Sequence, residues 1–155
     1  TTSRGGRGAA VQAGVRLATG DAILVLHADT LLPPDWDAAV LAALAQPEVL
    51  MTAFSFQCDR AQLMEPNCAP TGLALMEWTV NRRSRWFELP FGDQALATTK
   101  TTLARAGGYP ATCILEEYLL VNALRRMSAE GLGRIVTLPQ FALCSPRRWE
   151  RSTVW

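Results

Sequence analysis

The feature that most constrains the fold is a short apolar run, Ala22 to Leu26, that ends abruptly in polar residues. Five consecutive apolar residues have the length of a strand, and continuous apolarity is typical of a strand covered on both faces, as in a parallel sheet. The segment His27-Ala28-Asp29-Thr30 follows at once. Because ligands of open α/β sheets bind beyond the carboxyl ends of strands, these polar residues lie where a binding site is expected.

Helical and strand-like segments alternate along the rest of the chain. Apolar spacing and helix breakers predict helices over residues 9–19, 35–45, 71–86, 102–106 and 116–130. Short apolar runs predict further strands over residues 49–56, 95–98, 134–138 and 141–144. Thr71 is expected to cap the third helix. This alternation predicts an α/β fold, and 155 residues are enough for one domain over residues 1–155.

The charge balance limits the classes of partner. Lys and Arg total 15 against 14 for Asp and Glu, so the net charge is +1. A generic nucleic-acid binder needs a larger basic excess, and we therefore expect no nucleic-acid partner. No apolar run approaches the roughly 18 residues of a membrane span, and no signal-peptide pattern is present. We expect a cytoplasmic protein, either free or attached peripherally to a membrane.

The four cysteines are scattered and have no metal-site spacing. Cys58, Cys68, Cys113 and Cys144 form no CxxC pair, and His27 is the only histidine in the chain. A zinc site needs clustered ligands, so this pattern argues against one. Widely spaced cysteines are typical of reduced, partly buried thiols in a reducing compartment, although the spacing alone leaves a disulfide open.

Asp29 and His27 are the first candidates for chemistry. A carboxylate directly after a strand can bind a divalent metal that in turn holds a diphosphate. The alternative for Asp29 is a structural cap of the following turn. By the two-residue period of a strand, His27 points to the same face as Asp29, where it contacts a ligand or makes a local structural hydrogen bond.

Two other segments combine polar groups in a loop or at a helix start. Glu116 and Glu117 open the fifth predicted helix, where a carboxylate can act as a general base or can simply interact favourably with the helix dipole. The loop Gly92-Asp93-Gln94 has the composition of a ligand contact and equally that of a turn.

Arginine residues cluster in two further segments of the sequence. The segment Arg147-Arg148-Trp149 offers two guanidinium groups and an indole, which suit a diphosphate clamp or a solvated chain end. Arg82, Arg83 and Arg85 lie on one predicted helix. They form either an exposed helical face or, as the less favoured alternative, a contact for lipid or phosphate.

Taken in order, these motifs resemble the family 2 glycosyltransferases, which have the GT-A fold. The chain is most similar to a small bacterial-type subgroup whose metal motif reads His-Ala-Asp-Thr. The resemblance rests on an ordered set of short motifs: Gly6-Arg7, Gln12-Ala13-Gly14, Thr19-Gly20-Asp21, Leu26-His27-Ala28-Asp29-Thr30, Asn81-x-x-Ser84-Arg85, Pro90-Phe91-Gly92-Asp93-Gln94, Gly107-Gly108-Tyr109-Pro110, Leu115-Glu116-Glu117 and Arg147-Arg148-Trp149-Glu150-Arg151.

The resemblance implies a Rossmann-like mixed sheet flanked by helices and a sugar transfer that inverts the anomeric centre. Asp29 matches the last acid of an Asp-x-Asp motif that binds Mg or Mn on a nucleotide-diphosphate sugar, and His27 replaces the first acid. Arg7 and Gln12 fall in the helix that approaches the nucleotide. Asp93, with Gln94 beside it, falls in the loop near the sugar and the acceptor.

The same resemblance assigns the remaining roles. Glu117, next to Glu116, stands where the family carries the Asp that serves as general base. Arg147, Arg148 and Trp149 match a carboxyl-terminal Arg-Trp motif near the diphosphate and the acceptor. The acceptor itself is not indicated.

Family members begin with a strand and an acidic nucleotide-binding loop, and neither precedes Thr1 in this sequence. The chain is therefore expected to be an N-terminally truncated part of a catalytic domain. A non-catalytic binding or assembly module with the same fold is the alternative hypothesis. Strand edges left open by such a truncation would favour a homo-oligomer.

Overall fold

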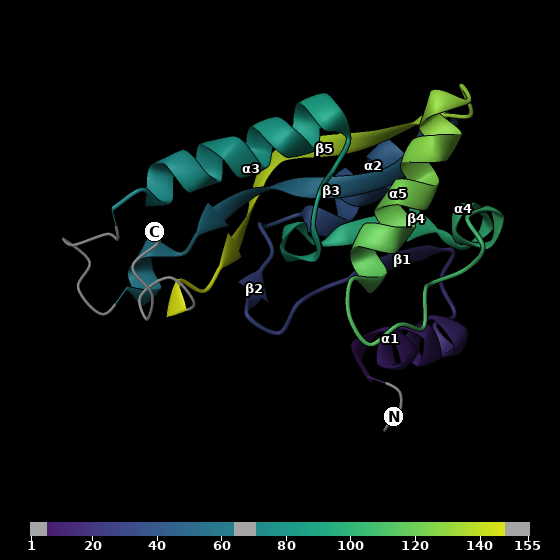
Figure 1. Cartoon of the computed structure of the whole chain (residues 1–155), viewed down its shortest axis with the longest axis horizontal. Coiled ribbons are helices and arrows are strands. Elements are labelled where there is room, and N and C mark those ends of the chain that lie inside the picture. Colours follow the sequence, from purple (N-terminus) through teal and green to yellow (C-terminus); the bar gives the residue numbers. More distant parts are fainter. Residues whose placement is uncertain (1–5, 64–70, 148–155) are drawn as a thin grey trace.

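Five strands form one mixed sheet in the order β1–β4–β3–β5–β2 (Figure 1). The computed structural model describes residues 6–63 and 71–147. The strands are β1 (Ala22–Val25), β2 (Thr30–Leu31), β3 (Val49–Cys58), β4 (Leu96–Thr99) and β5 (Arg134–Cys144). The helices are α1 (Gly6–Leu17), α2 (Trp36–Leu44), α3 (Leu73–Phe87), α4 (Lys100–Arg105) and α5 (Glu116–Ala129), with short 3₁₀ turns η1 (Arg60–Gln62) and η2 (Gly92–Gln94).

Strand direction brings several chain segments to one edge of the sheet. β3 and β5 run parallel, and β4 lies antiparallel to both β3 and β1. The carboxyl ends of β1, β3 and β5 therefore meet at the same edge, together with the amino end of β4. The register confirms this arrangement, because Val25 pairs with Leu96 and Thr30 pairs with Cys144.

The expected α/β class and the mixed sheet flanked by helices are confirmed, but the expected parallel environment of the first strand is wrong. β1 pairs antiparallel with β4 and lies at the end of the strand order. Only Ile23 of β1 is fully buried, and Leu26 just beyond it is exposed. The strand covered on both faces is β3, which is buried along almost its whole length. An apolar run shows that a segment is covered, but it does not reveal the direction of its neighbours.

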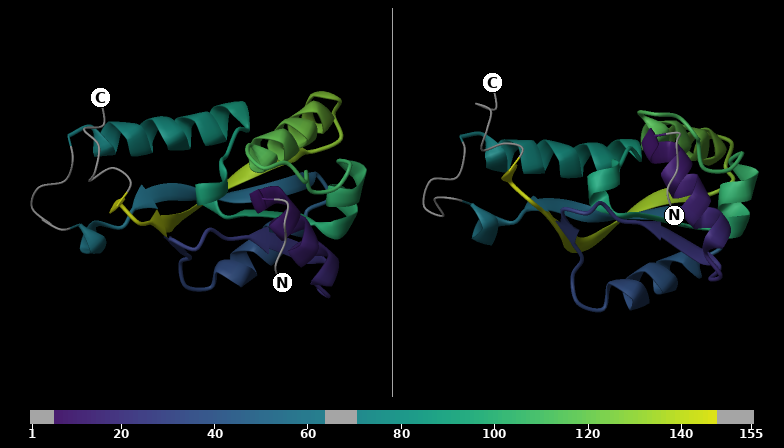
Figure 2. Two further views of the ribbon diagram at one scale, coloured as in Figure 1. Left: turned by 60° about the horizontal axis from the view of Figure 1, so that its bottom comes forward. Right: turned by 90° about the horizontal axis from the view of Figure 1, so that it is seen from below.

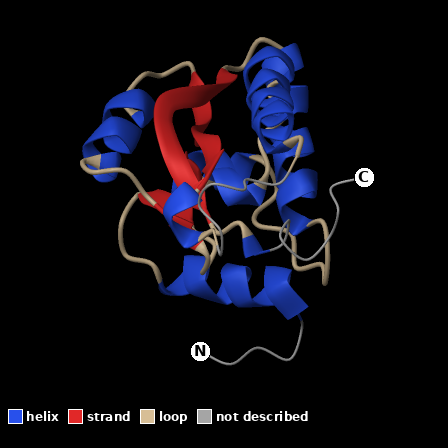
Figure 3. Cartoon of the chain, turned by 90° about the vertical axis from the view of Figure 1, so that its left-hand side faces the viewer, coloured by secondary structure: helices blue, strands red, loops and turns tan. Residues whose placement is uncertain are grey.

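Helices cover both faces of the sheet (Figure 2). α3 and α5 lie on one face, and α2 lies on the other. Apolar side chains of α5, including Leu120 and Leu124, pack with β3 and β5, whereas Val40 and Ala43 of α2 pack on the opposite face. Figure 3 shows the same two layers of helices on either side of the strands, with α1 lying across one end of the assembly.

The other differences from the expected elements have local causes. The predicted strands 134–138 and 141–144 form one strand, β5, whose register against β3 shifts between Phe54 and Ser55 and so absorbs the residues between them. α3 has Gly72 in a left-handed conformation at its N-cap, so Thr71 does not cap it. In the described residues no helix is long and apolar enough to cross a membrane.

α1 is held against the loop before α5 by a close backbone approach at Gly8. The Gly8 amide donates to the carbonyl of Thr112 at 3.2 Å. A Cβ atom at Gly8 would lie 2.5 Å from the carbonyl oxygens of Pro110 and Thr112, so only glycine permits this contact. This packing fixes the position of the neighbouring Arg7.

We therefore predict that Gly8→Ala lowers the free energy of unfolding by about 1–3 kcal/mol, as overpacking against backbone does. Gly14→Ala in the same helix is the matched control, because a Cβ atom there meets nothing within 4 Å. The control should gain about 0.5–1 kcal/mol from helix propensity. Urea unfolding of both variants checks the prediction, and equal stability of the two would contradict it.

Candidate active site

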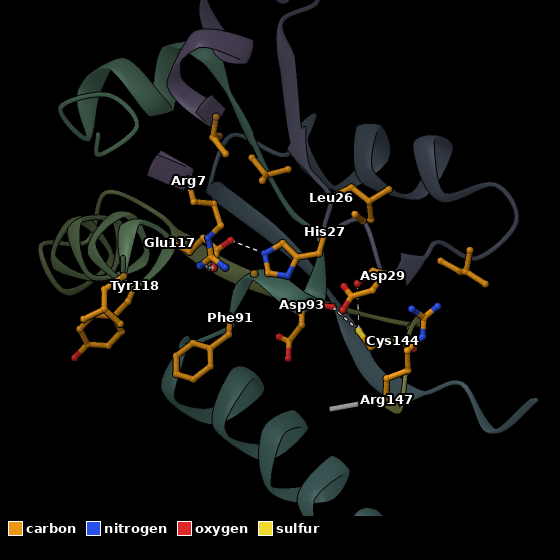
Figure 4. A pocket seen from close by; sticks show the side chains of 18 of the residues that line it. Arg7, Leu26, His27, Asp29, Phe91, Asp93, Glu117, Tyr118, Cys144 and Arg147 are labelled. Atoms are coloured by element: carbon orange, nitrogen blue, oxygen red, sulfur yellow. Dashed lines mark hydrogen bonds and ion pairs between the residues drawn. The ribbon is translucent and has the colours of Figure 1, made fainter. Parts of the chain in front are cut away.

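A pocket of about 1020 Å³ lies at the sheet edge where the strand ends meet (Figure 4). Segments far apart in the sequence build it: the start of α1, the loop after β1, the turn η2, the start of α5 and the end of β5. Its polar lining comprises Arg7, His27, Asp29, Thr30, Gln62, Asp93, Glu117, Tyr118, Cys144, Ser145 and Arg147.

Glu117 stands at the centre of the polar contacts in this pocket. It belongs to the first turn of α5, which begins after Leu115 in a left-handed conformation. One carboxylate oxygen of Glu117 lies 2.6 Å from Nε2 of His27, and the other accepts a hydrogen bond from Arg7 at 3.4 Å. Figure 4 shows the imidazole of His27 directed at this carboxylate. Three segments are thereby joined at one side chain.

Glu116 is held apart from the pocket by burial. Its side chain is 0% exposed, and it accepts a hydrogen bond from Nε of Arg7. Arg7 thus spans two adjacent carboxylates, one buried beneath α1 and one facing the pocket. Burying a carboxylate is costly unless it is paired, so the Arg7 guanidinium offsets part of the cost of burying Glu116.

The contact between His27 and Glu117 favours the charged form of both groups. The hydrogen bond to Glu117 raises the pKa of His27 above its ordinary value, more than burial and the Arg7 charge lower it. Burial raises the pKa of Glu117, but the hydrogen bond and charge of His27, with the charge of Arg7, outweigh burial and leave that pKa lowered. The contact therefore favours an imidazolium beside a carboxylate.

Asp93 has the opposite tendency in the same pocket. Burial raises its pKa above the ordinary value, and the charges of His27 and Arg83 reduce that shift. Its Oδ1 is buried and has no hydrogen-bond partner among the described residues. The backbone around it is fixed, since the Cys144 thiol donates to the Asp93 carbonyl at 3.1 Å. An unpaired buried oxygen in a pocket is suited to receive a ligand hydroxyl.

The backbone of Gly92 lies directly against the Glu117 carboxylate. Its backbone hydrogen bond to Glu117 is one of the contacts that lower the pKa of this carboxyl. A Cβ atom at Gly92 would lie 2.2 Å from the carboxylate carbon of Glu117. Position 92 therefore excludes every side chain if Glu117 is to keep its place.

Asp29 lines the pocket on the side away from the Glu117 contacts (Figure 4). Its backbone carbonyl accepts from the Ser145 amide at 2.9 Å, which ties the loop after β1 to the end of β5. In the described part of the chain its carboxylate has no ion-pair partner, and no cluster of three His, Cys, Asp or Glu side chains forms a metal site. One free carboxylate suits a magnesium-type ion that takes its other ligands from phosphate and water.

Comparison with known families decides the assignment. The sequence model described as Glycosyl transferase family 2 matches residues 1–107, which is more than half of the chain. The chain belongs to glycosyl transferase family 2. No curated protein and no solved structure matched the chain significantly. The family match covers Arg7, His27, Asp29 and Asp93, whereas Glu117 and Arg147 lie beyond it.

The structure of this family 2 domain brings together six of the predicted site residues. Arg7, His27, Asp29, Asp93, Glu117 and Arg147 all line the pocket. Gln12 instead donates to the Tyr109 carbonyl, and Gln94 is fully buried and donates to the Phe54 carbonyl. Glu116 lies beneath the pocket. Substrate contact by these three residues stays a prediction, and Arg148 and Trp149 lie outside the described residues.

Sequence reasoning missed Tyr118, Cys144 and Ser145 as pocket residues of this glycosyltransferase domain. Tyr118 directly follows Glu117, Cys144 ends the predicted strand 141–144, and Ser145 follows that strand. Polar residues at a strand's carboxyl end were the signal used for His27 and Asp29. Applied to β5, the same signal would have found Cys144 and Ser145.

Because His27 is the only histidine in the chain, its pKa can be measured without overlap and reports on the contacts in the pocket. We predict that Glu117→Gln lowers the pKa of His27 from its raised value towards the ordinary 6.5, because the amide cannot stabilise the imidazolium as the carboxylate does. The other charges near His27, those of Arg7 and Asp93, stay in place. Titration of the single imidazole by NMR in metal-free buffer measures the shift.

Gly92→Ala should produce the same fall in the His27 pKa, because the added methyl displaces the Glu117 carboxylate. Gly14→Ala, with no neighbour to displace, should leave the titration unchanged. A His27 pKa that is equal in the wild-type, Glu117→Gln and Gly92→Ala chains would refute the contact.

Proposed function

We propose that this chain transfers a sugar from a nucleotide-diphosphate sugar to an acceptor hydroxyl with inversion at the anomeric carbon. The observation that carries the proposal is the meeting of Asp29 and Glu117 in one pocket, from a loop after β1 and from the start of α5. An inverting transfer needs a diphosphate-binding group on one side of the sugar and a base on the other. Family membership supports the reaction class.

The diphosphate is proposed to bind beside Asp29. Asp29 would hold a Mg or Mn ion, and the exposed Arg147 lies in the same pocket as a second positive group. When bound, the ion neutralises charge on the departing nucleoside diphosphate. Arg7 adds a third positive charge at the amino end of α1.

The acceptor hydroxyl is proposed to enter between Glu117 and Asp93. Its proton passes to Glu117 while its oxygen forms a bond to the anomeric carbon, and the bond from that carbon to the diphosphate breaks. His27 and Arg7 keep Glu117 ionised and fix its orientation. Asp93, with its raised pKa and free Oδ1, orients the hydroxyl and is the second carboxylate able to take the proton.

Further parts of the proposal concern the chain as a whole. We take residues 1–155 as belonging to one catalytic domain that works in the cytoplasm, at or near a membrane. The outer edge of β1 has no strand partner among the described residues, so a second copy can pair there. Light scattering distinguishes such an oligomer from a monomer.

Calorimetry with UDP-sugars, GDP-sugars and other sugar nucleotides, with and without Mn, tests the donor. We predict that Asp29→Ala abolishes the metal-dependent part of binding. Asp37→Ala, in the first turn of α2, is the control and should bind as the wild type does. If the unaltered chain binds none of these donors, the proposal fails for this chain.

Glu117→Gln should bind the donor but lose about 10²–10⁴-fold in transfer rate, which is the usual effect of removing a general base. Asp93→Asn should raise the KM for the acceptor more than it lowers kcat. A Glu117→Gln chain that transfers at the wild-type rate while Asp93→Asn does not would assign the base to Asp93. If the wild-type chain and its variants bind donors but transfer no sugar, the protein is a binding module and not an enzyme.

A further inference from the structure

The outer face of α3 carries a stripe of large side chains that the described part of the chain leaves exposed. Leu75, Trp78, Arg82 and Trp86 are spaced by three, four and four residues, which places them on one side of the helix. Leu75 is 54% exposed, Trp78 53% and Trp86 65%. We call these four residues the outer stripe. Large apolar side chains gathered on an exposed face mark an interaction surface.

The inner face of α3 already supplies the contacts that hold the helix on the sheet. Leu73 packs with Phe56, and Asn81 both accepts from the Phe56 amide and donates to its carbonyl. Glu77 accepts from the Cys58 amide at 2.8 Å. Since these contacts lie away from the outer stripe, the stripe is not required for the position of α3.

Arg82 lies between the two exposed indoles. Its guanidinium is 4.8 Å from the ring centre of Trp78 and 3.9 Å from that of Trp86. Within the described residues no carboxylate pairs with it. The stripe thus presents one positive charge between two exposed aromatic side chains.

The stripe carries positive charge although the chain as a whole is balanced. The single acid of α3, Glu77, is already paired with Arg60. Of the three arginines of α3 only Arg82 lies in the stripe, because Arg85 donates to the Ser55 hydroxyl and Arg83 donates to the Leu89 carbonyl. Phe87, exposed at the end of the helix, extends the apolar surface. Its complement is therefore an anionic partner with an apolar layer beneath the charges.

We propose that the outer stripe of α3 docks the protein on an anionic lipid bilayer. Tryptophan side chains favour the headgroup level of a membrane, and arginine binds lipid phosphate. Leu75 would enter the acyl boundary beside the indoles, as in amphipathic helices that lie in the interface. A second copy is a poor occupant, because a two-fold contact centred on the stripe would bring its Arg82 against the same residue of the partner.

Membrane docking of α3 would also affect the pocket, because the other side of this helix contacts a residue that lines it. The guanidinium of Arg83 stacks 3.6 Å from the ring centre of Phe91, which lines the pocket. The helix that meets the membrane thus contacts the loop that carries Gly92 and Asp93. The proposal concerns a surface outside the pocket, so it stands or falls separately from the glycosyltransferase activity.

Flotation with phosphatidylcholine vesicles, with and without phosphatidylglycerol, tests the proposal on the full chain. The chain should float with the anionic vesicles and much less with the neutral ones. Trp78→Ser combined with Trp86→Ser should lower the partition coefficient roughly ten-fold or more by removing both indoles. Arg82→Gln should lower the partition coefficient about five-fold, and added salt should also lower it.

Trp36→Ser is the matched control, because Trp36 is a partly exposed tryptophan of α2 on the opposite face of the sheet. It should float as the wild type does, and circular dichroism should give equal melting temperatures for all variants. No flotation, flotation that the stripe variants do not change, or a dimer that Trp78→Ser and Trp86→Ser dissociate would overturn the proposal.

Discussion

The pocket depends on the charged contact between Glu117 and His27. This contact joins the start of α5 to the end of β1, and Arg7 adds α1 to the same carboxylate. The lowered pKa of Glu117 means that its contribution to stability is present above the ordinary pKa of 4.5 and is lost as the pH falls through the lowered value. The raised pKa of His27 means that its contribution is present below 6.5 and is lost as the pH rises through the raised value. The contact between Glu117 and His27 is therefore strongest in the mildly acidic range between these two ordinary pKa values.

Topology explains why a charged junction lies here. β1, β3 and β5 point the same way, so their carboxyl ends and the turn before β4 converge on one edge. Backbone groups left free at strand ends need polar partners, and the Asp29 carbonyl and the Asp93 carbonyl find theirs at Ser145 and Cys144. The apolar core holds the sheet and helices together, while these polar contacts fix the loops that line the pocket.

Local patterns predicted most elements, because apolar spacing and helix breakers act within a few residues. They did not predict which strands are neighbours: the apolar run of β1 looks as covered as β3 but lies at the end of the strand order. The site contacts span 109 residues from Arg7 to Glu116 and 90 from His27 to Glu117, and no spacing rule reaches so far. The sequence pointed to six of the pocket residues, with roles taken from the family's ordered motifs, but not to Tyr118, Cys144 or Ser145. The role of Gly92 could be understood only once the Glu117 carboxylate was seen against it.

The two carboxyl groups of the pocket differ in a way that the sequence could not show. Both are acids in loops or helix starts, yet one is paired with His27 and Arg7 and the other has an oxygen without a partner. Pairing lowers the pKa of Glu117, and burial raises that of Asp93. A paired carboxylate is held rigidly in the charged form, while an unpaired one gains most from a hydroxyl that enters the pocket. In the proposed transfer these two environments suit different tasks: the paired Glu117 would take the proton, and the free oxygen of Asp93 would orient the acceptor hydroxyl.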